Sequence, residues 1–184
     1  MKYIVCITGA SGVTLGFRLI DELLTGKHDV HVVITSNADD VITHELGKNF
    51  QYPKGATYYK DDDSNAALNS SSFTFDAAIV VPCSLKSLSS IATGFSHTLT
   101  TRVAENALRT RSTLIIVPRE TPLSASALEN MLALRRDGAI IFPPIVAYYH
   151  LPETVDDMTD FFIGKLLDLL GISNELYKRW NQSH

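Results

Sequence analysis

Apolar and polar positions along the chain follow two different periods. Continuous apolar runs rich in β-branched residues predict buried strands at 3–8, 30–35, 76–81, 113–117 and 139–142. Between these runs, apolar residues recur every three or four positions, which predicts helices at 13–24, 36–46, 85–92, 98–109, 124–135 and 155–170. Strands that alternate with helices are typical of a parallel sheet with helices on both faces.

This alternation predicts the fold class and most of the element boundaries. We predict an α/β protein, a single-domain, doubly wound, Rossmann-like or flavodoxin-like three-layer sandwich with a parallel sheet. Ser124 and Thr154 precede helical patterns and are the expected N-caps, and Gly171 is expected just past the last helix. Residues 50–75 are polar and irregular, and the charge run KDDD at 60–63 predicts a solvated loop there.

Composition and charge mainly exclude classes of protein. The chain has 184 residues, 45% of them hydrophobic, which is enough for a substantial core. Its net charge of −4 argues against nonspecific nucleic-acid binding, and no apolar run reaches the ~20 residues of a membrane span. Cys6 and Cys83 lie in apolar runs without metal-type spacing, which favours buried thiols in a reducing compartment and therefore a cytoplasmic protein.

Four polar stretches directly follow predicted strands. They are GASG at 9–12, SN at 36–37, PCSLKS at 82–87 and PRE at 118–120. In a doubly wound sheet the ligand lies beyond the carboxyl ends of the strands, so we expect these stretches to converge on one crevice.

The stretches at 9–12 and 82–87 have the small residues, backbone N–H groups and hydroxyls that suit a phosphate. GASG alone is weak evidence, because many turns of this kind carry glycine only to make the turn. The second strand ends in Ser36 rather than in an acidic residue that would hold a ribose hydroxyl, which argues against NAD. Two phosphate-type loops beside the Ser36 hydroxyl indicate a phosphorylated cofactor with further polar groups.

Arg119 and Glu120 are adjacent opposite charges that follow a buried strand and stand between Pro118 and Pro122. Proline restricts the backbone on both sides and so pre-organises the two charges. One interpretation is a structural salt bridge. The other gives Arg119 an anion to bind and Glu120 a proton to donate or accept.

The remaining candidate groups carry weaker signals. Arg102 and Arg109 lie seven residues apart on one predicted helix and project from nearly the same face, which is either a solvated face or part of the crevice. Cys83 is more consistent with a packed thiol than with a nucleophile. No metal is expected, since metal-ligand and triad spacings are missing from the histidines considered: His28, His44, His97 and His150.

Taken together, these residues resemble the UbiX/Pad1 family of flavin prenyltransferases. The resemblance runs from about residue 3 to residue 172 and rests most on PRETPL at 118–123, which is highly specific. The other motifs that carry it are GASG at 9–12, PCS at 82–84, IATG at 91–94, Arg102, and Pro152 followed by LDLLG at 167–171. It implies a flavoprotein (FMN-binding) domain at 1–172 and a C-terminal tail at 173–184 that could contact a neighbouring subunit.

The resemblance implies a metal-independent transferase, which joins a dimethylallyl group from dimethylallyl phosphate to N5 and C6 of reduced FMN. The residues that it assigns to FMN are Gly9, Ala10, Ser11, Ser36, Ser84, Leu85, Lys86, Ser87 and Arg119. Those that it assigns to dimethylallyl phosphate are Arg102, Arg109, Tyr149 and Lys165. Those to which it gives catalytic roles are Glu120, Glu45, Ser11 and Trp180, the last of them from the same or a neighbouring subunit.

The implied chemistry explains these residue types. Cationic side chains stabilise the charge that grows on the phosphate as the allylic C–O bond breaks, and Glu120 donates a proton to it. The aromatic face of Trp180 stabilises the allylic cation. The chain departs from the family pattern in three places: arginine replaces lysine at 109, lysine replaces arginine at 165, and His97-Thr98 replaces aspartate-asparagine. The first two keep the charge, so we expect phosphate binding to survive.

The resemblance also implies partners, and two alternatives stay open beside it. The product would be prenylated FMN for UbiD-type decarboxylases, and the chain would form a homo-oligomer, often a dodecamer in the family, without nucleic-acid or membrane partners. One alternative is an FMN-dependent cysteine-type decarboxylase of the same fold, which is weakened because PCSLKS at 82–87 stands where those enzymes have an asparagine-bearing motif. The other alternative is a non-catalytic flavin carrier.

Overall fold

The central feature of the fold is a six-stranded parallel sheet. The structure, a computed structural model, describes residues 1–180 of the chain. The strands are β1 (Lys2–Ile7), β2 (Asp29–Ile34), β3 (Thr57–Lys60), β4 (Ala77–Cys83), β5 (Thr113–Pro118) and β6 (Ile140–Ile141). Within the described residues they are hydrogen-bonded in the order β3-β2-β1-β4-β5-β6, and each pair is parallel. This order reverses between β1 and β4, as in a doubly wound sheet, and it confirms the predicted fold class.

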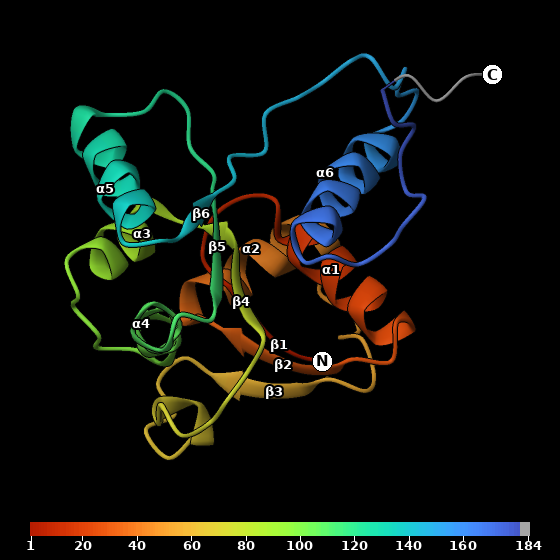
Figure 1. Ribbon diagram of the computed structural model, residues 1–184. Helices are drawn as coiled ribbons and strands as arrows, with labels where there is room; N and C mark the ends of the chain where they lie inside the picture. The colour runs from red at the N-terminus through yellow and green to blue at the C-terminus, as the bar shows by residue number, and fades with distance from the viewer. Residues whose placement is uncertain (181–184) are drawn as a thin grey trace. The chain divides into compact units, whose positions relative to one another are not determined.

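Helices cover both faces of this sheet (Figure 1). They are α1 (Val13–Thr25), α2 (Ser36–Leu46), α3 (Leu85–Ala92), α4 (Leu99–Thr110) and α5 (Ala125–Arg136), together with a short 3₁₀ turn, η1 (Ala67–Asn69). The side chains of β1 alternate between the faces, so that Ile4 and Cys6 join a core cluster with α3 and α4, whereas Ile7 faces Gly16 of α1. Burial on both faces explains why the strands appear in the sequence as continuous apolar runs.

The helix ends follow the capping residues in the sequence. The Ser124 hydroxyl accepts a hydrogen bond from the Ala127 N–H at the start of α5. Thr154 and Asp157 form a reciprocal capping box at the start of α6 (Val155–Leu169). Gly171 follows the end of α6 with a φ of +72°, the left-handed conformation that favours glycine. These three predictions are confirmed.

Residues 50–75, expected to be irregular, contain a strand that the sequence did not predict, and of the loop predicted at 60–63 only Lys60 belongs to that strand. Residues Thr57–Lys60 form β3, the edge strand beside β2, with Thr57 opposite His31. Its sequence, TYYK, has no continuous apolar run, so only the pairing with β2 makes it a strand. Asp61 in the charge run is also more than a solvated group, because its carboxylate accepts a hydrogen bond from the Thr100 N–H (2.8 Å) at the start of α4.

The chain divides into two compact units, residues 1–143 and the part from Pro144 onward. The first unit contains the sheet and α1 to α5, and the second contains α6 and the segment that follows it. The predicted boundary between 172 and 173 stays a prediction, because compactness alone does not define a cofactor-binding domain. None of the helices within residues 1–180 is long and apolar enough to cross a membrane.

Candidate functional site

A pocket of about 750 Å³ opens beyond the carboxyl ends of the strands of the first unit. It lies where the strand order reverses, and its volume is typical of small-molecule sites. The pocket brings together five of the residues assigned to the cofactor: Gly9, Ser36, Ser84, Lys86 and Ser87. The convergence expected from the carboxyl-end rule therefore holds for the stretches after β1, β2 and β4.

One wall of this pocket comes from residues that the sequence reasoning missed. The segment around β3 contributes Tyr52, Tyr58, Tyr59, Asp61 and Asp62. Burial raises the pKa of Tyr58 to about 12, so its phenol is a neutral hydrogen-bond donor at physiological pH, and it donates to the Pro53 carbonyl at 2.9 Å. The otherwise polar segment has three tyrosines among residues 52–59, which was a signal that it is more than a loop.

Thr8 joins the two loops at the reversal point. Its buried hydroxyl donates to the Pro82 carbonyl (2.8 Å) and accepts from the Ser84 N–H (2.8 Å). Ser84 in turn begins α3, since its hydroxyl accepts from the Ser87 N–H (3.2 Å). One threonine therefore fixes the end of β1 against the start of α3, which orients the hydroxyls of Ser84 and Ser87 at the pocket.

Gly9 lies against the first turn of α2. A Cβ atom placed on it would approach Asn37 Cβ to 2.6 Å and the Asn37 backbone to 3.0 Å, so only glycine allows this contact. No side-chain hydrogen bond caps α2 within the described chain, and the buried Thr35 hydroxyl just before α2 has no hydrogen-bond partner there. A bare helix N-terminus beside an unpartnered hydroxyl suits a phosphate or another anion.

Arg119 and Glu120 follow β5 but do not pair with each other. Among the salt bridges of residues 1–180 there is none between their side chains, which excludes the structural interpretation of the pair. The Arg119 N–H donates to the Cys83 carbonyl (3.1 Å), and the buried Arg119 Nε has no partner in the described chain. The exposed Glu120 carboxylate accepts from the Thr121 N–H (3.0 Å). A buried, unpartnered guanidinium nitrogen is a donor suited to an anion.

Glu45 caps the helix that follows GASG. Both of its carboxylate oxygens accept from the Gly12 N–H (3.0 Å), and one also accepts from the Val13 N–H (3.1 Å) at the start of α1. Gly12 has a φ of +92°, which a side chain would strain. The Glu45 carboxylate is thereby held at the N-terminus of α1, which follows Ser11 along the chain, and the roles of these two residues stay predictions.

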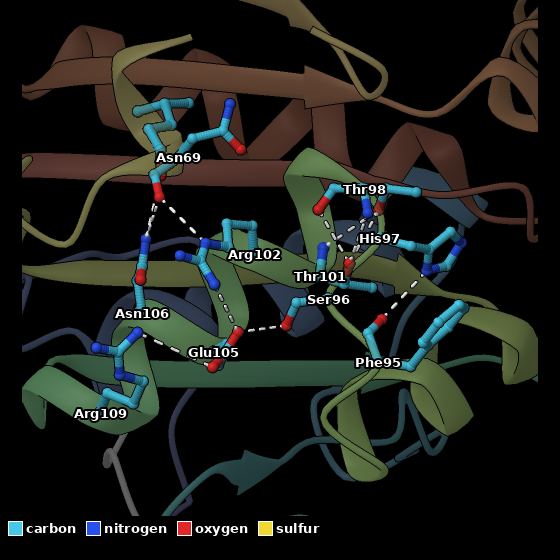
Figure 2. Close-up of polar contacts among 11 residues, drawn as sticks. Asn69, Phe95, Ser96, His97, Thr98, Thr101, Arg102, Glu105, Asn106 and Arg109 are labelled. Atoms are coloured by element: carbon cyan, nitrogen blue, oxygen red, sulfur yellow. Dashed lines mark hydrogen bonds and ion pairs between the residues drawn. The ribbon is translucent and has the colours of Figure 1, made fainter. Parts of the chain in front are cut away.

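Eight predicted residues of the first unit do not line the pocket, and Glu45, Arg119 and Glu120 are among them. Ala10 is buried, Ser11 is exposed, and Leu85 packs against the core cluster. Two others, Arg102 and Arg109, lie farther along α4 and share Glu105 (Figure 2). Arg102 bonds Glu105 at 3.2 Å and the Asn69 carbonyl at 3.2 Å, and Arg109 lies 3.9 Å from the same carboxylate. A hydrogen bond from Ser96 and the two guanidinium groups lower the pKa of Glu105, which therefore stays ionised and holds both arginines.

His97, one of the departures from the family pattern, lines the pocket and is exposed. Its ring stacks on Phe95 with centroids 4.5 Å apart, and its Nδ1 lies 3.1 Å from the Phe95 carbonyl (Figure 2). No group of three or more potential metal ligands gathers among the described residues. Burial raises the pKa of Cys83 to about 12, so this thiol is a packed group rather than a nucleophile at neutral pH.

The last three predicted residues belong to the second unit. Tyr149 and Trp180 contact each other edge to face, with ring centroids 5.5 Å apart. Lys165 lies on α6 with its ammonium 5.7 Å from the ring centroid of Tyr177. The described chain therefore places a phenol, a cation and an indole in one unit, while the roles of all the predicted site residues stay predictions.

The sequence matches one family model over most of its length. The model of the family described as Flavoprotein matches residues 1–168. Flavin prenyltransferase UbiX from Methanocaldococcus jannaschii is 48% identical over 182 residues, which cover 98% of this chain and 98% of that protein. The corresponding protein from Thermoplasma acidophilum is 42% identical and is covered in full.

Solved structures agree with these sequence matches. AnUbiX (PadA1), solved in complex with FMN and dimethylallyl pyrophosphate, superposes with a TM-score of 0.92 at 36% identity, over 100% of this chain and 98% of that one. The dodecameric FMN-dependent Ubix-like decarboxylase from Escherichia coli O157:H7 superposes with a TM-score of 0.91 at 37% identity, over 98% and 100%. Peptidyl-cysteine decarboxylase EpiD, with a TM-score of 0.62 and 19% identity, shares the fold alone.

Proposed function

The chain belongs to the Flavoprotein family and, within it, to the UbiX flavin prenyltransferases, and from that premise we propose that it transfers a dimethylallyl group from dimethylallyl phosphate to reduced FMN. The observation that carries this proposal is the pocket at the reversal point of the sheet, into which two helix N-termini and the loop after β1 converge. AnUbiX (PadA1), which superposes over the whole of this chain with a TM-score of 0.92, was solved in complex with FMN and dimethylallyl pyrophosphate.

The residues around the pocket fit a phosphorylated flavin. The bare N-terminus of α2, the unpartnered Thr35 hydroxyl and the hydroxyls of Ser84 and Ser87 suit its phosphate and hydroxyl groups. Gly9 allows α2 to pack closely against the loop after β1, and the unpartnered Nε of Arg119, outside the lining of the pocket, offers a further donor. When bound, reduced FMN supplies the nucleophilic ring positions N5 and C6, which accept the prenyl carbons.

The phosphate of the dimethylallyl donor needs groups that stabilise negative charge. Arg102, Arg109 and Lys165 have cationic side chains, and Tyr149 offers a phenolic donor. As the allylic C–O bond breaks, these groups stabilise the phosphate, and Glu120 gives it a proton. In this scheme the Trp180 ring stabilises the positive charge on the allyl group.

Glu45 and Ser11 lie at the start of α1, beside the loop that is assigned to the flavin. Glu45 is an acceptor whose position is fixed by two backbone N–H groups, so in this proposal it orients the reacting end and takes up a proton there.

We extend the proposal to the partners of the protein. The product, prenylated FMN, is delivered to a UbiD-type decarboxylase, because a modified cofactor needs a recipient enzyme. The chain forms a homo-oligomer, and the dodecameric relative from Escherichia coli makes a dodecamer the first state to test by light scattering. The cytoplasm is its compartment, because Cys6 and Cys83 are both free, buried thiols.

The test is an anaerobic incubation of the purified protein with reduced FMN and either dimethylallyl monophosphate or the pyrophosphate. We expect the flavin mass to rise by one C5 unit, about 68 Da, with at least one of the two donors and not without a donor. FMN that binds tightly but keeps its mass with both donors would refute the transferase and leave a flavin carrier. Release of carbon dioxide from an added cysteine-type substrate would instead support the decarboxylase.

A further inference from the structure

The segment after α6 is held to that helix by one carboxylate. Asp168 accepts four hydrogen bonds from the described residues, all from side chains of the following segment. Arg179 binds both oxygens of the carboxylate, at 2.7 and 2.9 Å, while Tyr177 donates at 2.6 Å and Asn174 at 3.0 Å. A bidentate guanidinium–carboxylate pair has a narrow range of geometries, so this group, which we name the Asp168 clasp, fixes where the chain runs.

A glycine inside α6 makes room for the same segment. A Cβ atom on Gly164 would approach the Tyr177 ring to 2.4 Å and the Asn174 side chain to 2.8 Å. Glycine in the middle of a helix destabilises it by roughly 1 kcal/mol relative to alanine. Here the close packing of Tyr177 against the helix offsets that loss. Asn174 also donates to the Gly164 carbonyl at 3.1 Å. The docking of the segment therefore rests on shape as well as on charge.

The clasp continues into a cluster of aromatic rings. Tyr177 contacts Phe161 edge to face at 5.2 Å, and Phe161 contacts Tyr149 at 5.9 Å in the same manner. Trp180, one residue past Arg179, packs edge to face on Tyr149 at 5.5 Å. His150 stacks on Phe161 with centroids 4.5 Å apart and so belongs to the same cluster.

Within residues 1–180, burial does little to hold the Trp180 side chain in place. This side chain is 72% exposed. A residue that is this exposed keeps one orientation only if the backbone next to it is fixed, and the bidentate pair formed by Arg179 fixes that backbone.

We propose that Asp168 is a positioning residue for prenyl transfer, because its clasp on Asn174, Tyr177 and Arg179 sets the Trp180 indole against Tyr149. This inference rests on the proposed function and adds a residue that touches neither flavin nor donor. Because of the clasp, Trp180 and Tyr149 of the same chain act together at one site.

The composition of the chain provides a direct probe of this inference. Trp180 is the single tryptophan, so protein labelled with 5-fluorotryptophan gives one ¹⁹F resonance from the full-length, FMN-loaded chain. The resonance responds to the ring of Tyr149, and urea-unfolded protein gives the reference position without that contact.

The variants are Asp168→Asn, which removes the charge, and Tyr177→Phe, which removes one donor and keeps the ring on Gly164. Asp156→Asn is the matched control, because Asp156 is an exposed aspartate in the first turn of α6. We expect Asp168→Asn to move the resonance toward the unfolded position and to lower kcat at least about tenfold, with the Kd for FMN unchanged within about twofold. Tyr177→Phe should give a smaller change of the same kind, and Asp156→Asn should match the wild type.

A failure of this inference and a failure of the proposed function give different results. If the wild type prenylates FMN and Asp168→Asn leaves both the resonance and kcat unchanged, the positioning role is overturned. If Asp168→Asn loses kcat only because it unfolds, it will also lose FMN. Tyr177→Phe then decides: an unchanged resonance in that variant would overturn the positioning role. If the resonance moves as expected but the wild type makes no prenylated flavin, the proposed function fails and the clasp has only a structural role.

Discussion

Replacing Gly9 with alanine should damage the cofactor pocket through space alone. The new Cβ would lie 2.6 Å from Asn37 Cβ and 3.0 Å from the Asn37 backbone, where ordinary contact begins at 3.4 Å. The clash is with the Cβ and the backbone of Asn37 in α2, which cannot turn away as the end of a flexible side chain can. Gly9 is not among the glycines with positive φ, so the substitution adds no backbone strain of its own.

The magnitude follows from this overlap. Overpacking of this kind costs about 1–3 kcal/mol of the free energy of unfolding. The first turn of α2 has to move away from Gly9, and Ser36 lies in that turn at the pocket wall. The loss of one charge-assisted hydrogen bond to a phosphate costs about 1.5–3 kcal/mol, so the Kd for FMN should rise at least about tenfold.

Two assays separate the effects, urea unfolding for stability and fluorescence titration of FMN for binding. Gly138→Ala is the control, because Gly138 has open space around it but a φ of +106°, so alanine there costs about 1–2 kcal/mol through strain, away from the pocket. We expect both variants to lose stability and only Gly9→Ala to lose affinity. A Gly9→Ala protein that binds FMN as tightly as the wild type does would refute the assignment of this loop to the cofactor.

Three further predictions concern single groups. Asp61→Ala removes the acceptor of the Thr100 N–H, and urea unfolding should show a loss of about 1 kcal/mol; an unchanged midpoint would contradict its capping role. Cys83 has a pKa raised to about 12, so iodoacetamide at pH 8 should label it far more slowly than a free cysteine, and rapid labelling of the folded protein would contradict its burial. The hydrogen bond from Arg179 lowers the pKa of Asp168 to about 2, below the unfolded value, so the carboxylate stabilises the fold above about pH 4 and loses this effect as the pH falls toward 2. In urea unfolding at pH 6, the free energy of unfolding of the wild type should therefore exceed that of Asp168→Asn by about 1–2 kcal/mol. This difference should vanish by pH 2, and a difference that stays constant with pH would be inconsistent with this titration.

The sequence predicted those elements whose stability is local or lies in the core. Strands such as β1 and β4 are buried on both faces, so their apolar runs are continuous and could be recognised without knowing their partners. Caps such as Ser124 and Thr154 act on the next three residues, so they too could be predicted locally. The edge strand β3 forms only by pairing with β2, and no local pattern in TYYK reveals that partner.

The features of the candidate site also divide into those that the sequence could predict and those that it could not. The rule that ligands lie at the carboxyl ends of parallel strands sufficed to place Gly9, Ser36 and Ser84 at one pocket. The three tyrosines at 52–59 were a visible signal, but their place at the pocket wall could not be predicted, because it depends on where β3 attaches. Neither could the Asp168 clasp, since its carboxylate meets donors that are up to 11 residues away along the chain. Both features arise from tertiary contacts rather than from periodicity or a motif.

The most direct test of the central claim compares two glutamates that differ in their place in the fold. Glu120 follows β5 beside Arg119, and Glu129 is an exposed residue of α5 with the same side chain. In single-turnover, anaerobic reactions with reduced FMN and dimethylallyl phosphate, we predict a gain of about 68 Da on the flavin for the wild type and Glu129→Gln. Glu120→Gln should bind FMN with an unchanged Kd and leave the flavin mass unaltered. Prenylation by Glu120→Gln at the wild-type rate would contradict the proton-donor role of Glu120 and with it the account of the site.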